Sequence, residues 1–162
     1  MKTAWDDHAV VDVLVSVPRG WEVVSDLPDG LPFAARGAPT EHGFRPNVVL
    51  TLDEVADDEV ADWEQSSDVL MSETMRDHLL IDRGHVERAD GTTFLQRTGQ
   101  HVTDEGWIVT FDQWTFARGG TGYTLTATVT SVDFDEWADV LAEIGHRFAD
   151  PTDAPTDGRE ST

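Results

Sequence analysis

Residues 92–130 have the sequence TTFLQRTGQHVTDEGWIVTFDQWTFARGGTGYTLTATVT, and this stretch decides the fold. Its last part, 123–130, places apolar side chains on every odd position and threonine on every even position. A period of two is typical of a β-strand with one buried face. Two turns that contain glycine, at 104–106 and 118–122, separate this strand from two earlier ones. The stretch therefore predicts three consecutive antiparallel strands.

The middle strand of the three changes its alternation partway along. Trp107 falls on an odd position, whereas Trp114 and Phe116 fall on even positions. A β-bulge near 112–113 would return these side chains to one face. The other explanation is that both faces of the strand are covered. Without a bulge, we expect one of the two tryptophans to be exposed, and an exposed aromatic side chain marks a contact surface.

Further elements follow from β-branched alternation and from apolar residues spaced by three and four. Asp133 and Glu136 fit a capping box at the start of the last helix. Strands joined by hairpins, with only two helices, indicate the α+β class with a largely antiparallel sheet. Residues 1–149 are expected to form one domain, and 150–162 a disordered acidic tail. We expect strands at 10–17, 21–25, 33–37, 47–53, 82–88, 92–102, 107–117 and 123–130, and helices at 58–80 and 133–148.

The composition limits the partners that this chain can have. Its 162 residues carry 32 Asp and Glu against 11 Lys and Arg, a net charge of −21. Such a surface repels phosphates and anionic lipids, so we expect neither nucleic acid nor a membrane as partner. It suits a basic protein partner or a salt-tolerant source.

The cysteine count and the first residues limit the chemistry and the compartment. The absence of cysteine excludes disulfides, thiolate nucleophiles and cysteine metal sites. Asp6 and Asp7 lie where a signal peptide would have its apolar core, and no apolar run is long enough to span a membrane. A cytoplasmic location is therefore expected.

Two segments resemble a known family. Residues 15–23, VSVPRGWEV, are similar to the opening strand and turn of the Mog1/PsbP-like superfamily. Residues 46–54, PNVVLTLDE, are similar to its next core strand as found in the actinobacterial LpqN-type branch. The resemblance implies an α/β/α sandwich around an antiparallel sheet. It also implies an accessory or binding role, since one branch of the superfamily binds a small nuclear GTPase and another a photosynthetic complex.

The LpqN-type branch consists of lipoproteins and secreted proteins, and this chain departs from it. It lacks the lipidation cysteine and, in its first residues, a signal peptide. The resemblance carries over no catalytic residues.

The candidate chemical groups give no strong signature. His78, His85 and His101 are the nearest thing to a metal set, but a hairpin turn at 89–91 places His85 opposite 95–97, away from His101. Neither a metal nor a cofactor is predicted. Asp112 could serve as a general base if burial raises its pKa, or it could face solvent or satisfy a bulge.

The sequence predicts a non-enzymatic protein-binding or accessory module. We expect recognition of a basic partner through a sheet face or a loop edge near Trp107, Trp114 and the loop 38–46, and the same patch could support a homodimer. The alternative is a small-ligand binder or an enzyme with a pocket between the sheet and the helix at 58–80. The candidate partner-binding residues are Trp107, Asp112, Trp114, His42 and Phe44.

Overall fold

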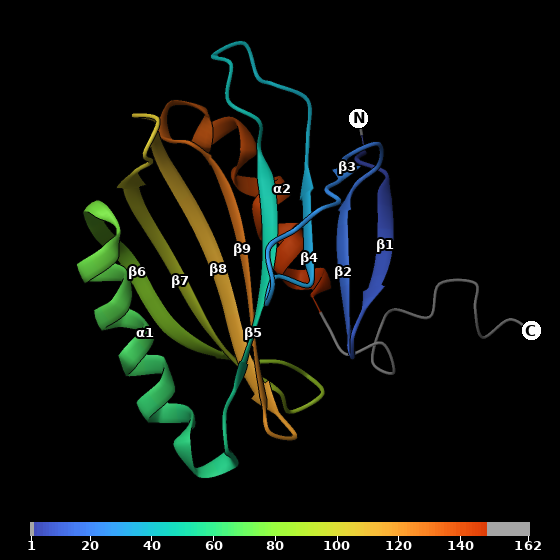
Figure 1. Cartoon of the computed structure of the whole chain (residues 1–162). Helices are drawn as coiled ribbons and strands as arrows, with labels where there is room; N and C mark the ends of the chain where they lie inside the picture. Colours follow the sequence, from blue (N-terminus) through green and yellow to red (C-terminus); the bar gives the residue numbers. More distant parts are fainter. Residues whose placement is uncertain (1, 149–162) are drawn as a thin grey trace, which may run out of the picture.

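The computed structural model describes residues 2–148, so the tail predicted at 150–162 lies outside the described residues. A seven-stranded antiparallel sheet runs in the order β3-β4-β5-β9-β8-β7-β6, and β1 and β2 form a separate hairpin (Figure 1). Neither α1 nor α2 is long and apolar enough to cross a membrane. The strands are β1 Trp5–Val10, β2 Val13–Pro18, β3 Glu22–Val23, β4 Phe33–Arg36, β5 Asn47–Glu54, β6 Arg76–Glu87, β7 Thr93–Val102, β8 Ile108–Arg118 and β9 Thr121–Thr130, and the helices are α1 Val60–Thr74 and α2 Phe134–Arg147.

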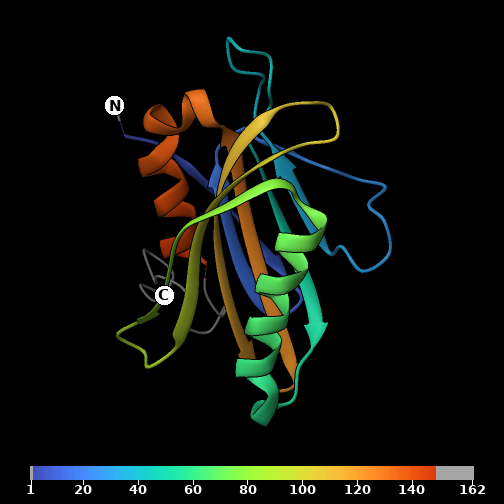
Figure 2. The same cartoon turned by 90° about the vertical axis from the view of Figure 1, so that its left-hand side faces the viewer.

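The two helices lie on opposite faces of the sheet (Figures 1 and 2). This arrangement confirms the predicted α+β class and the sandwich architecture. On one face, α2 and the β1–β2 hairpin enclose an apolar core, in which Val15, Leu125, Leu141 and Ile144 are fully buried. Burial of this apolar surface is the main force that holds the layer together.

Helix α2 approaches the sheet closely because Gly145 has no side chain. A Cβ atom at this position would lie only 1.9 Å from Cε2 of Trp114. At the C-terminal end of α2, Arg88 donates hydrogen bonds to the carbonyl oxygens of Gly145 and Phe148. The guanidinium group of Arg88 lies 3.9 Å from the centre of the Phe94 ring. Arg88 thus supplies donors to two carbonyl groups at the end of the helix, where partners within the helix run out.

Helix α1 is attached to the other face through polar groups. Arg97, only 1% exposed, donates to Asp68 Oδ1 at 2.7 Å, to Gln113 Oε1 at 2.8 Å and to the carbonyl oxygen of Glu64 at 2.8 Å. Arg83 Nε makes a second ion pair with Asp68 at 3.0 Å. A buried arginine requires such a complete set of partners, so α1 is held by directional bonds more than by apolar burial.

Strand β8 contains no bulge. Its pairing with β9 is continuous from Val109 to Arg118, and its pairing with β7 is continuous as well. Both faces of β8 are covered, and this coverage, which was the alternative to a bulge, explains why the apolar side chains change from odd to even positions. Trp114 and Phe116 face α2, whereas Phe111 lies on the opposite face beside Gly99. Trp107 precedes the strand, and it is half-buried.

Two element boundaries predicted from the sequence are wrong. The first helix ends at Thr74, and the segment 76–80, expected to be its last part, begins β6. Register shifts between Arg76 and Leu79 and between Leu80 and Asp82 interrupt the alternation there, so its apolar spacing imitates a helix. The strand expected at 10–17 is a hairpin, because Val11 adopts a φ of 54° and turns the chain.

Candidate functional site: a cleft beside helix α2

A cleft of about 580 Å³ lies where the loop 38–46 meets the beginning of α2 and the turn after β2. Three segments that are distant in the sequence form it, and the sheet and α2 fix their positions. Its lining includes Arg19, Trp21, Thr40, Glu41, Glu136 and Trp137.

Local sequence shapes two of these segments. Gly20, with a φ of 90°, ends the turn that follows β2 and lets Trp21 enter the cleft. In the loop, the backbone N–H of Thr40 donates to the carbonyl oxygen of Phe44 at 2.9 Å, and Gly43 adopts a φ of 92°. The tip of the loop is therefore a closed turn.

The carboxylate of Asp133 fastens the loop to the start of α2. It accepts hydrogen bonds from Thr130 Oγ1 at 2.6 Å and Thr40 Oγ1 at 2.9 Å, and His42 Nδ1 lies 2.9 Å from its Oδ1 atom. These hydrogen bonds, with that of Thr130 foremost, lower the pKa of Asp133. The expected capping box is wrong, because the side chain of Asp133 makes no capping hydrogen bond.

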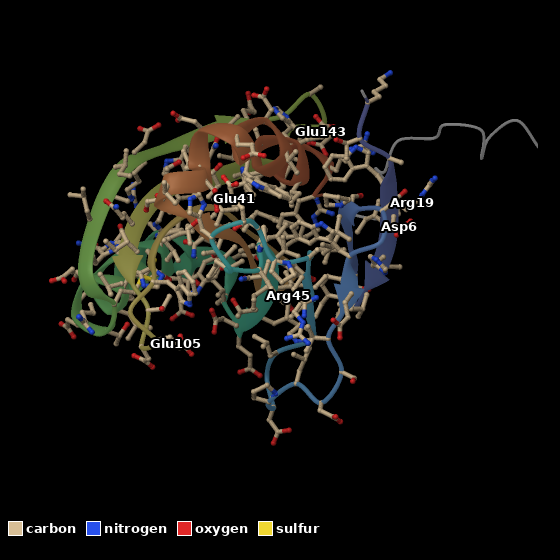
Figure 3. All side chains as sticks on the ribbon, turned by 90° about the horizontal axis from the view of Figure 1, so that it is seen from above. Asp6, Arg19, Glu41, Arg45, Glu105 and Glu143 are labelled. Atoms are coloured by element: carbon tan, nitrogen blue, oxygen red, sulfur yellow. The ribbon has the colours of Figure 1, made fainter. Side chains whose placement is uncertain are left out.

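The charges in the cleft are mainly negative. Glu41, Asp133 and Glu136 contribute carboxylates, whereas Arg19 contributes the one cation among the described residues of this lining. Arg19 is itself close to an acid, with Nε 3.6 Å from Asp6 Oδ1, and the two lie next to each other in Figure 3. A cationic group that entered the cleft would therefore meet favourable electrostatics.

Two indole rings form the apolar part of the lining. The centroids of Trp21 and Trp137 are 6.1 Å apart, and their planes are inclined by 51°. Both side chains are half-buried and pack against the main core from its margin. The two rings therefore contact each other, and the face of an indole ring attracts a cation as well as an apolar group.

Three of the five candidate residues lie together at this end of the molecule. His42 contacts Asp133, and the rings of Phe44 and Trp107 meet edge to face with their centroids 5.7 Å apart. The loop 38–46 thus contacts the turn before β8 on one side and the start of α2 on the other. Their role in binding a partner stays a prediction.

The other two candidates, Asp112 and Trp114, are buried inside the molecule with exposed fractions of 6% and 4%. Because a protein partner can contact only surface groups, the structure removes both from the predicted docking surface. Desolvation raises the pKa of Asp112, and Thr98 Oγ1 donates to its Oδ1 atom at 2.7 Å. Asp112 thus has the environment of a perturbed carboxyl, and it does not line the cleft.

The histidines considered for a metal set are separated. His78 and His101 contact the ring of Phe111, with centroid distances of 6.3 and 5.8 Å, while His85 Nε2 lies 3.0 Å from Glu64 Oε1. Within residues 2–148, no three or more His, Asp or Glu side chains are arranged to hold a metal ion.

The alternative pocket between the sheet and the first helix stays a prediction. The Arg97 network occupies the interface between α1 and the sheet, and a pocket of about 610 Å³ lies along α1, lined by Asp62, Gln65, Ser66, Val69, Leu70 and Glu73. A further cavity of about 300 Å³ borders the C-terminal end of α2, between Val86, Phe94, Trp114 and His146.

Sequence reasoning missed the main components of the cleft. The sequence pattern indicates a helix cap at Asp133 and assigns no site role to Trp21 or Trp137. Thr40 and Asp133 are separated by 93 residues, so no local pattern could predict their contact. Only the loop 38–46, near which partner recognition is predicted, points to this region.

No protein-family model matches the sequence, and no curated protein matches it either. Solved structures match the fold. LpqN of Mycobacterium tuberculosis, described as involved in cell envelope biogenesis, aligns with a TM-score of 0.65 and 15% identity over 92% of this chain and 91% of its own. Cyanobacterial PsbP from Synechocystis aligns with a TM-score of 0.63 and 11% identity over 93% and 94%. PA94 of Pseudomonas aeruginosa, a protein of unknown function, aligns with a TM-score of 0.62 and 13% identity over 86% and 92%.

Proposed function

We propose that this chain, which has the Mog1/PsbP-like fold implied by the resemblance, is a non-enzymatic accessory module that binds a basic protein partner. The cleft beside α2 receives a lysine or arginine side chain of that partner. The observation that carries this proposal is the combination, in one cleft, of two inclined indole rings with the carboxylates of Glu41 and Glu136.

The physical reason is that the two kinds of group attract the same ligand. The face of an indole ring carries negative electrostatic potential, and a cation over it gains about 0.5–2 kcal/mol, depending on its exposure. The nearby carboxylates add Coulomb attraction, and the aliphatic stem of a lysine or arginine would contact the rings. A neutral or anionic group would gain much less from this lining.

The charge of the whole molecule supports the same class of partner. A net charge of −21 attracts a cationic protein over distances of about a Debye length, roughly 8–10 Å in physiological salt. This attraction accelerates encounter more than it strengthens the final complex. Binding is therefore expected to weaken as salt is added.

The test uses two short peptides, one alternating lysine with serine and the other alternating glutamate with serine. Binding is followed by the indole N–H signals of the protein in NMR spectra, since the chain has six tryptophans. We expect the lysine peptide to shift the signals of Trp21 and Trp137 and the glutamate peptide to shift neither. The double variant Glu41→Gln/Glu136→Gln should bind the lysine peptide several-fold more weakly, since each exposed pairing contributes roughly 0.2–1 kcal/mol.

A matched control distinguishes binding in the cleft from attraction by the net charge of the molecule. Asp57→Asn/Asp58→Asn removes the same number of negative charges from the beginning of the first helix, at the opposite end of the molecule (Figure 1). This variant should bind the lysine peptide almost as well as the original protein does. Equal losses in the two double variants, or binding that leaves both indole signals in place, would refute the cleft as the binding site.

A further inference from the structure

The two edge strands of the sheet differ greatly in length. One edge is β3, which has only two residues, and the other is β6, which has twelve. Strand β6 also exposes apolar side chains, with Leu79 56%, Ile81 54% and Val86 47% exposed. A long edge strand with open backbone groups is a ready surface for pairing with another strand.

One hydrogen bond fixes which backbone groups of β6 are open. The N–H of Arg88 donates to the carbonyl oxygen of Thr92 at 2.9 Å, so the polar groups of Arg88 point toward β7. These directions alternate along an antiparallel strand, and the pairing is regular from Asp82 to Glu87. The N–H and C=O groups of Arg83, His85 and Glu87 consequently point outward, away from the sheet.

The charge of β6 is unlike that of the rest of the chain. Residues 76–88 contain three arginines and three acids, which gives a net charge of zero in a chain whose net charge is −21. Two copies of such an acidic protein repel each other wherever their acidic surfaces meet. The neutral edge is a surface on which this repulsion is smallest, and its regularly paired part carries both signs, with Asp82, Arg83, Glu87 and Arg88.

We infer that two copies of this chain pair through β6, antiparallel, with His85 on the twofold axis. This register places Arg83 opposite Glu87 of the second copy and Asp82 opposite Arg88 of the second copy. Gly84, whose Cβ position has no atom within 4 Å, then lies opposite Val86 of the second copy. Arg83, His85 and Glu87 exchange about two backbone hydrogen bonds with each opposing residue, and two seven-stranded sheets become one.

Neighbouring registers match the charges less well. A twofold axis at Arg83 would place two arginines in direct opposition, and an axis at Gly84 would place Asp82 opposite Val86. Since like charges opposite each other destabilise a strand pair and unlike charges stabilise it, the axis at His85 is favoured. The β6 edge and the loop 38–46, which joins β4 to β5, lie toward opposite ends of the strand order, so this pairing is independent of the proposed cleft.

Sedimentation velocity from micromolar to submillimolar concentration tests the proposal. The mass should rise from 17.9 kDa toward twice that value. Glu87→Arg places two arginines in opposition at both ends of the pair and should weaken dimerisation about tenfold. The exchange Arg83→Glu/Glu87→Arg should restore it, and Glu105→Arg, which changes the net charge equally at a turn at the far end of β8, should not weaken it.

A second variant and a second measurement protect the test from effects on folding. His85→Pro removes an outward N–H, which an edge strand tolerates in the monomer, and should abolish dimerisation while circular dichroism stays unchanged. In the original protein, amide exchange at Arg83, His85 and Glu87 should slow as concentration rises. A mass that stays at one copy at every concentration, exchange that does not slow, or a dimer that survives both Glu87→Arg and His85→Pro would overturn the proposal.

Discussion

Replacing Gly145 with alanine should destabilise the protein, although the same change in an exposed helix stabilises. At an exposed position alanine is favoured over glycine by about 1 kcal/mol. Here the new methyl carbon would lie 1.9 Å from Trp114 Cε2 and 2.2 Å from its Nε1, where carbon atoms normally stay about 3.5–4 Å apart. Trp114 is only 4% exposed and has little room to retreat, so α2 must move outward, and its own Leu141 and Ile144 lose contacts in the core.

The magnitude follows from these two opposing terms. Overpacking a dense core costs about 1–3 kcal/mol, and so severe an overlap belongs at the upper end of that range. After subtracting the helix preference, we expect a net loss of about 2 kcal/mol in the free energy of unfolding, or roughly 4–8 °C in Tm for a domain of this size.

Urea denaturation followed by tryptophan fluorescence measures this loss. Gly84→Ala is the matched control, because no atom lies within 4 Å of its Cβ position, and it should change stability by no more than about 1 kcal/mol. If Gly145→Ala unfolds at the same urea concentration as the original protein or a higher one, with an unchanged slope, the close seating of α2 on Trp114 is refuted.

Substitutions at three residues test the polar interior. Arg97→Met should lower the free energy of unfolding, measured by urea denaturation, by about 3–5 kcal/mol, because Gln113 and the carbonyl oxygen of Glu64 lose their donor. Arg97→Lys should lower it less, and equal losses would contradict the role of the guanidinium group. Asp112→Asn should raise stability at pH 7, because the raised pKa of Asp112 in the folded protein means that its ionisation opposes folding. The gain should vanish when the pH falls below the pKa that Asp112 has in the unfolded chain. Asp133→Asn should lower stability at pH 7, by about 2 kcal/mol, and this deficit should disappear as the pH falls through the lowered pKa of Asp133; a deficit that persists in acid would count against the ionised carboxylate.

The sequence predicted those parts of the fold that depend on short-range periodicity. Residues 123–130 form a strand as expected, because the alternation of one face buried and one face polar is a local property. The error at 76–80 has an equally local cause. Two irregularities in β6 disturb its alternation, and side chains such as Leu79 remain exposed, so the segment has the apolar spacing of a helix without being one.

The candidate site was only partly predictable, because its parts meet through the tertiary fold. His42 and Phe44 were named from their loop, but the contact of His42 with Asp133 spans 91 residues and leaves no trace in either segment. Asp112 shows the converse problem. A single acid on an otherwise apolar strand suggests an outward position, yet β8 lies in the interior of the sheet and is covered on both faces, so its carboxyl group is buried.

The polar attachment of α1 has a consequence for the order in which the protein opens. An apolar interface weakens gradually as groups slide over each other, whereas a set of directional bonds around one guanidinium group is lost together. Hydrogen exchange should therefore find α1 leaving the sheet as a unit, at a lower free energy than global unfolding, while α2 and the core stay closed. In that open form, the threonines of β9 and the buried arginine of β7 would meet water, and the sheet would keep its shape.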